Sequence, residues 1–351
     1  MREIKRRWPA EWERHAATWL AWPHHREDWP DKFEAIPWVY AEIVRTLHVR
    51  EHVHILCNDA EAADDARRLL SSHAVDANRY SLHLVPTNRV WLRDSAPTGV
   101  VGPSGFEWIR WRFNGWAKYP NHQLDDRVPD AVARISGESS VPATRPDVDR
   151  TPLILEGGGI EGNGEGILLV TEEWLLSDVQ VRNPGMTRET YERCFAEYLG
   201  IDRTIWLGEG AVGDDTHGHI DDLARFTDPR TIVLAYEEDS ADANHERSVD
   251  NLRRLELASY ETPGGLRIVR LPFPRPVIMD GERLPASYAN FYIANGVVLV
   301  PTFNDRNDRL ALNILADLFP DRDVIGIHAV DLVWGLGTLH CLTQQQPYLE
   351  G

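Results

Sequence analysis

A cysteine in a polar, glycine-containing segment is the residue of this sequence best suited to nucleophilic chemistry. Cys341 follows a stretch with two glycines, 335–340, and precedes an amide-rich stretch, 343–346. Structural cysteines normally lie in packed patterns, as Cys57 does in a strand pattern and Cys194 in a helical one. A nucleophilic thiol needs a nearby positive charge or base to lower its pKa from about 8.5. Cys341 is therefore a candidate nucleophile, with a structural loop residue as the alternative.

Two histidines and four aspartates occur together in the segment 213–222. In an extended chain residues two apart share a face, so His217, His219 and Asp221 could converge as metal ligands. Alternatively, His219 transfers protons and Asp221 binds a cation, while Gly218 permits close approach of the backbone. A third interpretation is a solvated acidic loop. So many like charges are costly unless a cation neutralises them.

Two further carboxylates stand in turns that follow strand-like runs. Asp94 is either a solvated turn residue or one that holds a planar cation against the ring of Trp91. Glu156 opens a glycine-rich stretch, 157–162, that formally matches a dinucleotide-binding motif. We exclude that function because a turn and a strand follow where the motif requires a helix N-terminus. Glu156 is thus expected either to face a ligand or to serve as an acceptor within the turn.

Short β-rich runs alternate with helical patterns along the chain, which predicts an α/β protein. The strands are expected at 52–57, 80–85, 153–155, 167–170, 231–235, 266–271, 297–300 and 324–327. The helices are expected at 33–48, 60–72, 188–199, 244–260 and 306–319. No linker divides the chain, and 137–150 is interpreted as a surface excursion within one domain.

The polar loops that follow these strands recur at intervals of roughly 50 to 70 residues, a range typical of supersecondary repeats. They lie near Asp94, Glu156, His219, Asn290 and Cys341. Five similar modules in a ring would bring all five loops to one central cavity. An open doubly wound sheet is the alternative.

Composition excludes several classes of partner. The 55 acidic against 37 basic residues give a formal charge of −18, which repels nucleic acid and anionic lipid but attracts small cations. Three scattered cysteines are too few for a disulfide framework. We find no signal peptide and no apolar stretch long enough to span a membrane. These features predict a cytoplasmic protein.

Together, segments along the whole chain resemble the agmatine deiminase and bacterial, Porphyromonas-type peptidylarginine deiminase family, within the pentein superfamily of guanidine-modifying enzymes. The matching segments are PAEWE (9–13), TWLAWP (18–23), WLRD (91–94), RFNGW (112–116), LEGG (155–158), DTHGHID (215–221), ERS (246–248), SYANFYIANG (287–296) and HCLTQQQP (340–347). The sequence departs from the typical family pattern at Thr338-Leu339, at His217 and at Trp116-Ala117-Lys118. These departures affect the expected identity of the substrate and leave the four positions to which the family chemistry is assigned, Cys341, His219, Asp94 and Asp221, unchanged.

The resemblance implies a five-fold pseudosymmetric α/β propeller, the pentein fold, with a central active-site cavity. It implies a single deiminase domain over residues 1–351, built of about five ββαβ-like modules. Cys341 would be the nucleophile, His219 the acid and base, and Asp94 and Asp221 the carboxylates that hold the guanidinium. The further substrate-binding candidates are Asp215, Glu156 and Trp91.

The reaction implied is hydrolysis of a C–N bond in a linear amidine through an amidino-cysteine intermediate, without a metal or any other cofactor. Agmatine would give N-carbamoylputrescine and ammonia, a step of putrescine and polyamine biosynthesis. An arginyl peptide is the alternative substrate, and self-association into a homo-oligomer stays open. Two other classes are weighed: a metal-dependent hydrolase using His217, His219 and Asp221, and a non-catalytic cation-binding protein.

Overall fold

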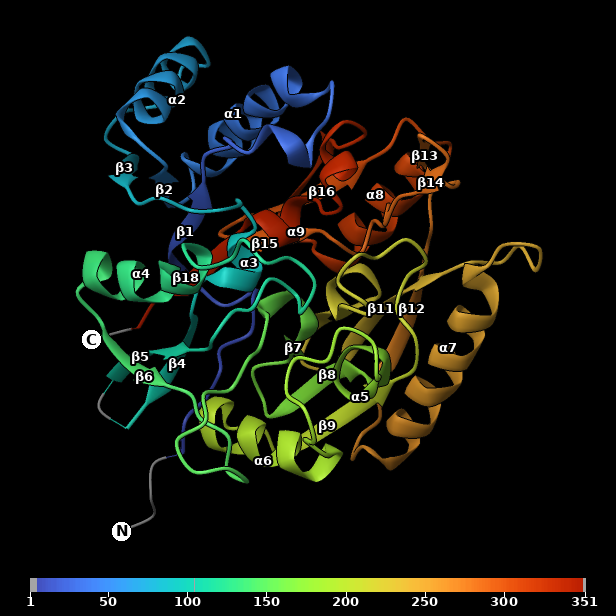
Figure 1. The fold of residues 1–351 in the computed structure, drawn as a ribbon. Coiled ribbons are helices and arrows are strands. Elements are labelled where there is room, and N and C mark those ends of the chain that lie inside the picture. Colours follow the sequence, from blue (N-terminus) through green and yellow to red (C-terminus); the bar gives the residue numbers. More distant parts are fainter. Residues whose placement is uncertain (1–4, 104, 350–351) are drawn as a thin grey trace.

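The computed structural model describes residues 5–103 and 105–349, in which strands and helices alternate along the chain as the sequence predicts (Figure 1). The α-helices are α1 (Ile36–Leu47), α2 (Ala60–Ser72), α3 (Leu92–Ser95), α4 (Val128–Ser136), α5 (Glu172–Leu176), α6 (Arg188–Leu199), α7 (Asn244–Glu261), α8 (Asp308–Leu318) and α9 (Leu339–Leu342). The short 3₁₀ helices are η1 (Arg26–Asp28), η2 (Phe33–Ala35), η3 (Asp125–Arg127), η4 (Gly157–Gly159), η5 (Ile220–Asp222) and η6 (Leu332–Gly335). None of the helices in these ranges is long and apolar enough to cross a membrane.

Within the described residues, the strands form five sheets of three or four strands and one two-stranded hairpin. Four of the sheets are β4 (Thr98–Gly102), β5 (Gly105–Arg110) and β6 (Ser139–Pro142); β7 (Glu161–Gly162), β8 (Ile167–Thr171) and β9 (Arg203–Leu207); β10 (Ala224–Asp228), β11 (Thr231–Tyr236) and β12 (Arg267–Pro272); and β15 (Tyr292–Ala294), β16 (Val297–Thr302) and β17 (Asp323–His328). The fifth is β18 (Gln344–Pro347), β1 (His15–Ala21), β2 (His52–Cys57) and β3 (Tyr80–Leu84), and the hairpin is β13 (Ile278–Met279) with β14 (Glu282–Arg283).

All five sheets share one pairing pattern. The first strand runs antiparallel to the second, and the second runs parallel to the third. A helix connects the second and third strands each time, because parallel neighbours require a crossover connection. The last strand of the chain, β18, pairs with β1 and so joins the two ends in one sheet.

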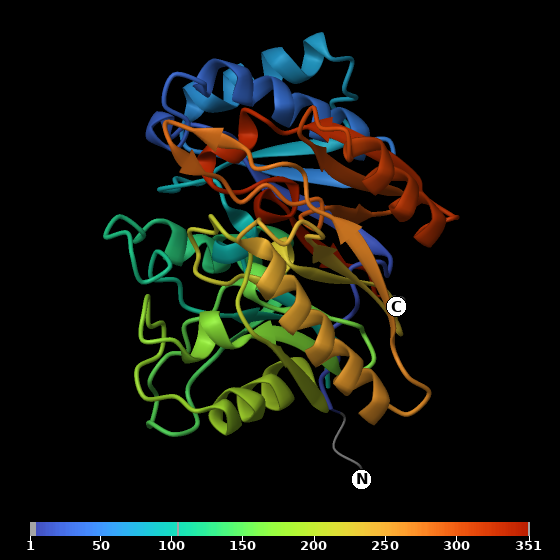
Figure 2. The same ribbon diagram turned by 90° about the vertical axis from the view of Figure 1, so that its right-hand side faces the viewer.

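The middle strands form the hydrophobic centre of each sheet. In β11 and β16 five of six residues are buried, as expected of strands covered on both faces. Helices α1, α2, α4, α6, α7 and α8 lie on the outside, whereas the short α3 and α9 lie near the centre (Figure 1). The side view shows α7 running along the outer face of the molecule (Figure 2). Large aromatic side chains, among them Trp19, Trp29, Trp108 and Trp174, are fully buried between these layers.

Two local predictions need correction. The segment 153–155 forms one isolated bridge, Ile154 to Arg112, rather than a strand. The segment 137–150 is mostly exposed or half-buried, as a surface excursion would be, but it contains β6, which pairs in parallel with β5 and was not predicted. This strand has only four residues, Ser-Ser-Val-Pro, so its sequence carries little strand signal.

Each of the five polar loops noted in the sequence lies directly before the first strand of a sheet. α3 precedes β4, η4 precedes β7, η5 precedes β10, the loop 285–291 precedes β15, and α9 precedes β18. The repeated sheet pattern therefore places all five loops in equivalent positions of the chain.

Candidate active site

The five loops meet, and their predicted site residues contact one another. The Asn290 side-chain amide donates to the Cys341 thiol sulfur at 3.0 Å and to an Asp222 carboxylate oxygen at 3.0 Å. The Gly158 backbone N–H donates to Asp94 Oδ1 at 2.9 Å. Asp221 Oδ2 lies 3.6 Å from Cys341 Sγ. The sequence therefore correctly predicted that these loops gather at one place.

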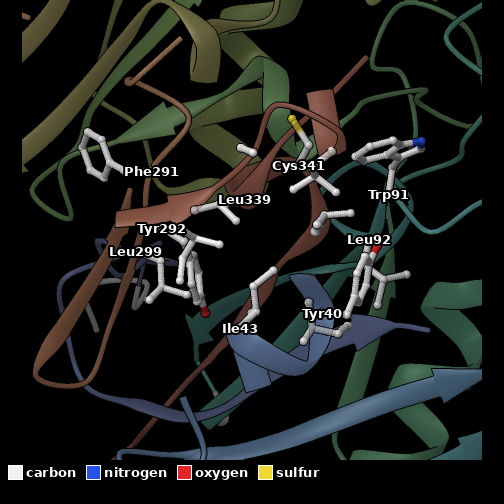
Figure 3. Close-up of a cluster of buried hydrophobic side chains, with 14 of the residues drawn as sticks. Tyr40, Ile43, Trp91, Leu92, Phe291, Tyr292, Leu299, Leu339 and Cys341 are labelled. Atoms are coloured by element: carbon white, nitrogen blue, oxygen red, sulfur yellow. The ribbon is translucent and has the colours of Figure 1, made fainter. Parts of the chain in front are cut away.

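Cys341 lies on α9 at the edge of the largest hydrophobic cluster. Figure 3 shows its sulfur directed away from the side chains of Leu339 and Tyr292 and on the same side as Trp91. Burial raises the pKa of the Cys341 thiol well above its usual value, and the charges of Asp221, Asp222 and Asp94 raise it further. The thiol is therefore protonated beside these carboxylates, and a cation placed among them would favour the thiolate.

His219 is fully buried between two carboxylates. Its Nδ1 lies 3.7 Å from Asp94 Oδ1 and its Nε2 lies 3.5 Å from Glu156 Oε2, while the Trp174 ring packs edge-on against the imidazole. Burial alone would lower the pKa of His219, but the charges of Asp94 and Glu156 outweigh it and raise the pKa to about 9. The imidazole is therefore charged at neutral pH and can donate a proton.

The Glu156 carboxylate contacts His219 and two other buried side chains. It accepts from Trp174 Nε1 at 2.7 Å and from Arg182 Nε at 3.1 Å. Burial would raise the pKa of Glu156, but Arg182 and His219 bring it down to about 2. Both Glu156 oxygens are thus engaged by side chains from other segments rather than by its own turn, which leaves neither of them free for a ligand.

Asp94 and Asp221 lie close to one point beside the Gly158 backbone. A Cβ atom on Gly158 would lie 2.7 Å from His219 Nδ1, 2.8 Å from Asp94 Oδ1 and 3.1 Å from Asp221 Oδ2. Glycine is therefore required for the close approach of η4 to these groups. Burial raises the pKa of Asp94 to about 6 against the opposing charge of His219.

Asp221 has one oxygen in use and one free. Its Oδ2 accepts from His340 Nδ1 at 2.7 Å, whereas no described residue hydrogen-bonds to its buried Oδ1. Burial would raise the pKa of Asp221, but the hydrogen bond and charge of His340 lower it instead. A buried, ionised oxygen without a partner is costly, which indicates that a cationic ligand completes its hydrogen bonding.

A cavity of about 750 Å³ opens onto this cluster. Asp94 and Cys341 line it together with the indoles of Trp91 and Trp116, and Trp116 Nε1 donates to Asp94 Oδ2 at 2.9 Å. Gly337 leaves the room in which the Trp91 ring packs beside Cys341, because a Cβ there would lie 2.7 Å from the indole. The cavity thus offers aromatic faces and a carboxylate next to the thiol, a setting suited to a planar cation.

The remaining acidic candidates of the segment 213–222 are already engaged by protein groups. Asp215 lines the cavity but forms an ion pair with Lys118 and accepts from the Tyr119 hydroxyl at 2.8 Å. Asp214 accepts from the backbone N–H groups of the turn that presents His219. Burial, and then the charge of Asp221, raises the pKa of Asp222 well above its usual value.

His217 does not join His219 and Asp221. Its Nε2 lies 3.0 Å from the Ser177 hydroxyl and its Nδ1 lies 3.8 Å from Glu173. Its φ of 66° turns the chain at this position, so the alternating pattern assumed for an extended strand does not apply. Among the described residues, no group of three or more His, Cys, Asp or Glu side chains is arranged to hold a metal ion.

Several residues of the site were assigned no role from the sequence. Asn290, Trp116, Arg182 and His340 all contact a predicted site residue, yet each lies more than twenty positions from its partner in the chain. Thr338, one of the departures from the family pattern, donates to Asn290 Oδ1 at 2.7 Å and so supports the amide that contacts Cys341. These contacts depend on the meeting of separate loops.

Comparison with known proteins agrees with this geometry. The model of the Porphyromonas-type peptidyl-arginine deiminase family matches residues 7–347. An agmatine deiminase from Stutzerimonas stutzeri (strain A1501) is 33% identical over 364 residues, covering 97% of this chain and 95% of that protein. The structure of the agmatine deiminase of Enterococcus faecalis matches with a TM-score of 0.88 and 28% identity, covering 98% of this chain and 96% of that one.

A more distant structure, the amidinotransferase SxtG from Microseira wollei, shares the fold with a TM-score of 0.52 and 12% identity over 98% of both chains. The fold is thus the mixed α/β fold of deiminases and amidinotransferases, and its site gathers a cysteine, a histidine and two carboxylates. The chain belongs to the Porphyromonas-type peptidyl-arginine deiminase family. The resemblance identified from the sequence is confirmed.

Proposed function

We propose that this protein hydrolyses the guanidinium group of agmatine to N-carbamoylputrescine and ammonia, with Cys341 as the nucleophile. The observation that carries the proposal is the pair of buried carboxylates beside the thiol, Asp94 and Asp221, with Asp221 Oδ1 lacking a partner among the described residues. Family membership and the names of the relatives support it. The bound cation would neutralise the carboxylates that make the empty site unfavourable.

Substrate binding is proposed to generate the nucleophile. The planar guanidinium presents paired N–H donors, which suit the oxygens of Asp94 and Asp221. Its charge offsets the carboxylates that raise the pKa of the Cys341 thiol, so the thiol loses its proton to solvent as the substrate binds. The Asn290 amide, which donates to Cys341 Sγ, stabilises the resulting thiolate.

The first chemical step forms a bond from Cys341 Sγ to the central guanidinium carbon. The protonated His219 then donates its proton to the departing nitrogen, and the C–N bond breaks to release ammonia. An amidino group remains on the sulfur. In the second step, the neutral His219 takes a proton from water and the resulting hydroxide attacks the same carbon. The C–S bond then breaks, and the hydroxyl proton of the adduct passes to the departing sulfur, which gives the ureido product, the Cys341 thiol and a protonated His219.

Agmatine is the preferred substrate in this proposal because the cavity is acidic. Among the described residues that line it, six carboxylates face three Lys or Arg side chains. The distal ammonium of agmatine is attracted by this excess, whereas the α-carboxylate of free arginine is repelled. A like-charge contact at about 4 Å in partly screened surroundings is worth a few kcal/mol, so discrimination should be about tenfold or more.

We therefore expect kcat/KM to decrease from agmatine to an arginyl peptide to free arginine. The test is to measure ureido product and ammonia in parallel for the three substrates at equal ionic strength. Equal amounts of ureido product and ammonia are expected from agmatine. A faster reaction with the peptide would replace agmatine by peptidyl arginine as the substrate.

Peptidyl arginine is the second candidate because Asp215, the acidic group placed to receive a distal ammonium, is already paired with Lys118. A peptide lacks that ammonium and leaves the pair intact, whereas agmatine must compete with Lys118. Replacing Lys118 by methionine should therefore increase the preference for agmatine over the peptide. An unchanged ratio of the two kcat/KM values would remove Asp215 from substrate recognition.

The pH dependence of kcat/KM follows from Asp94, His219 and the Cys341 thiol. Asp94, with a pKa raised by burial to about 6, loses its charge below that pH and no longer attracts the guanidinium. Burial and the neighbouring carboxylates raise the pKa of the thiol, which must lose its proton to solvent as the substrate binds, so kcat/KM should increase with pH. His219, with a pKa raised to about 9 against the effect of burial, loses its proton above that pH and cannot protonate the leaving group. We expect kcat/KM for agmatine to increase with pH and to stop increasing near pH 9. A continued increase above pH 10 would contradict the role of a protonated His219.

We also propose that residues 1–351 form one deiminase domain arranged as a five-fold pseudosymmetric α/β propeller around the site. The shared pairing pattern of the five sheets and the meeting of the five preceding loops support this arrangement. The cytoplasmic location remains a proposal that rests on the three free cysteines, which suit a reducing compartment.

A further inference from the structure

Glu11 lies beneath the site and belongs to a sequence motif, 9–13, that the proposed chemistry does not use. Its buried carboxylate accepts from Arg93 at 3.1 Å, from Arg225 at 2.8 Å and from His340 Nε2 at 2.9 Å. It also accepts from the Ile293 backbone N–H at 2.8 Å. These donors lie on α3, α9, β10 and β15, so one carboxylate connects the N-terminal segment to the elements that form the site.

Two of these donors are chain neighbours of the proposed reacting groups. Arg93 directly precedes Asp94, and His340 directly precedes Cys341. Arg93 further donates to the His340 carbonyl at 3.3 Å and to Gln345 at 2.7 Å, which links α3 to α9. A displaced Glu11 would therefore shift both the guanidinium-binding carboxylate and the thiol.

The His340 ring lies between two carboxylates. Its Nε2 lies 2.9 Å from Glu11 and its Nδ1 lies 2.7 Å from Asp221 Oδ2. Burial would raise the pKa values of both acids, but for Glu11 the charges of Arg225, His340 and Arg93 lower it, and for Asp221 the hydrogen bond and charge of His340 do so. The charges of Arg225 and Arg93 favour an ionised Glu11, and those of His219 and Arg225 favour an ionised Asp221, independently of His340. Where both acids are ionised, both short contacts are hydrogen bonds only if each ring nitrogen carries a proton.

We propose that Glu11 is a positioning residue that holds His340 in its doubly protonated form and thereby keeps Asp221 ionised, with Oδ1 free for the substrate. This arrangement parallels a buried carboxylate that orients a functional histidine from behind. The effect of Glu11 on turnover rests on the proposed function, whereas its effect on the protons of His340 does not.

Other charged and titratable groups face these three side chains. Those around Glu11 are Arg93, Arg225, Glu161, His15 and Tyr292. Those around Asp221 are His219, Asp94, Asp222 and Cys341. The charge of Asp94 disfavours a charged Asp221, those of His219 and Arg225 favour it, and His340 is the basic group in direct contact with it.

Glu11→Gln removes the charge with little change of shape. The amide can keep its oxygen toward Arg225 and Ile293 and then presents its NH₂ group to His340 Nε2, which becomes a neutral acceptor. The same NH₂ group also removes the hydrogen bond from Arg93, so Arg93→Gln serves as a second control. We expect kcat/KM for agmatine to fall by about a hundredfold. Glu51→Gln is the matched control, since Glu51 is equally buried, contacts His15 at 3.3 Å and accepts from the Asn295 backbone N–H, yet touches no site residue. Its kcat/KM should stay within about threefold of the wild type.

A double-mutant cycle separates positioning through His340 from a general loss of structure. If Glu11 acts through His340, adding Glu11→Gln to His340→Gln should lower kcat/KM by less than about threefold. Multiplicative losses in the double variant would overturn the proposal.

NMR of protein labelled with ¹⁵N in its histidine rings shows which ring nitrogens carry a proton. The loss of one set of signals in His340→Gln identifies those of His340 among the 14 histidines. At pH 8 both His340 nitrogens should be protonated in the wild type, and Nε2 should become unprotonated in Glu11→Gln. A singly protonated His340 in the wild type would overturn the proposal even if Glu11→Gln does not fold. The NMR result does not depend on turnover. A protein inactive on agmatine would therefore refute the proposed function, whereas the protonation state of His340 would still be tested by NMR.

Discussion

Replacing Cys341 by alanine is expected to lower kcat/KM for agmatine by a factor of about 10⁴ or more, because no other group near the bound carbon can form the covalent intermediate. The sulfur lies at the edge of the core and points away from Leu339 and Tyr292 (Figure 3), so its removal leaves the packing of α9 largely intact. The variant should therefore retain its fold by circular dichroism and still bind agmatine. Steady-state ureido formation measures the loss.

The two other cysteines provide the controls for this variant. Cys57 and Cys194 are fully buried in separate hydrophobic clusters, and burial raises the pKa of each thiol to about 12. Replacing either by alanine should keep most activity and cost about 1 kcal/mol of unfolding free energy. Substantial turnover by Cys341→Ala would refute the covalent mechanism.

Replacing His219 by glutamine is expected to lower kcat by a factor of about 10³, since general acid–base catalysis contributes about 10² to 10⁴. Glutamine cannot donate a proton to the leaving nitrogen or accept one from water. If the release of ammonia is the easier step to sustain without the imidazole, the amidino adduct should accumulate on Cys341. Intact mass after a denaturing quench would show it.

His217 is the matched control for His219, because it lies two positions away and contacts Ser177 and Glu173 instead of the site carboxylates. His217→Gln should keep kcat within about threefold. Full steady-state activity in His219→Gln would remove His219 from the mechanism, and equal losses in the two variants would assign the effect to the loop rather than to the imidazole.

The sequence predicted those elements whose boundaries are marked by local chemistry. The bounds of α2 and α6 agree with the expected ranges because Asp59 and Thr187 cap their first turns and Gly200, with a φ of 73°, ends α6. The middle strands β8, β11 and β16 were predicted because strands covered on both faces are continuous apolar runs. The middle strands β1 and β5 were not predicted. The first strands of the sheets, such as the two-residue β7 and the glutamine-rich β18, lack such a run.

Some residues of the candidate site could also be predicted from the sequence and others could not. Cys341 and His219 stood out because they occur beside glycines in polar loops, whereas the roles of Asp94 and Asp221 were implied by the family resemblance. The structure brings all four side chains together. Whether they perform the assigned roles remains a prediction. Asn290 and Glu11 had motifs but no role, since their importance comes from contacts with loops far away in the chain. The ion pair of Asp215 with Lys118 could not be predicted either, because the two residues are far apart in the chain.

A single-turnover experiment tests most directly whether this protein deiminates agmatine through Cys341. The wild-type enzyme in excess over agmatine would be quenched with acid at successive times, digested, and each cysteine peptide analysed by mass spectrometry. We predict an amidino adduct on the Cys341 peptide that appears before the ureido product and decays as that product forms, with Cys57 and Cys194 unmodified. Ureido product formed with no adduct on Cys341 at any time, including in His219→Gln, would contradict this mechanism.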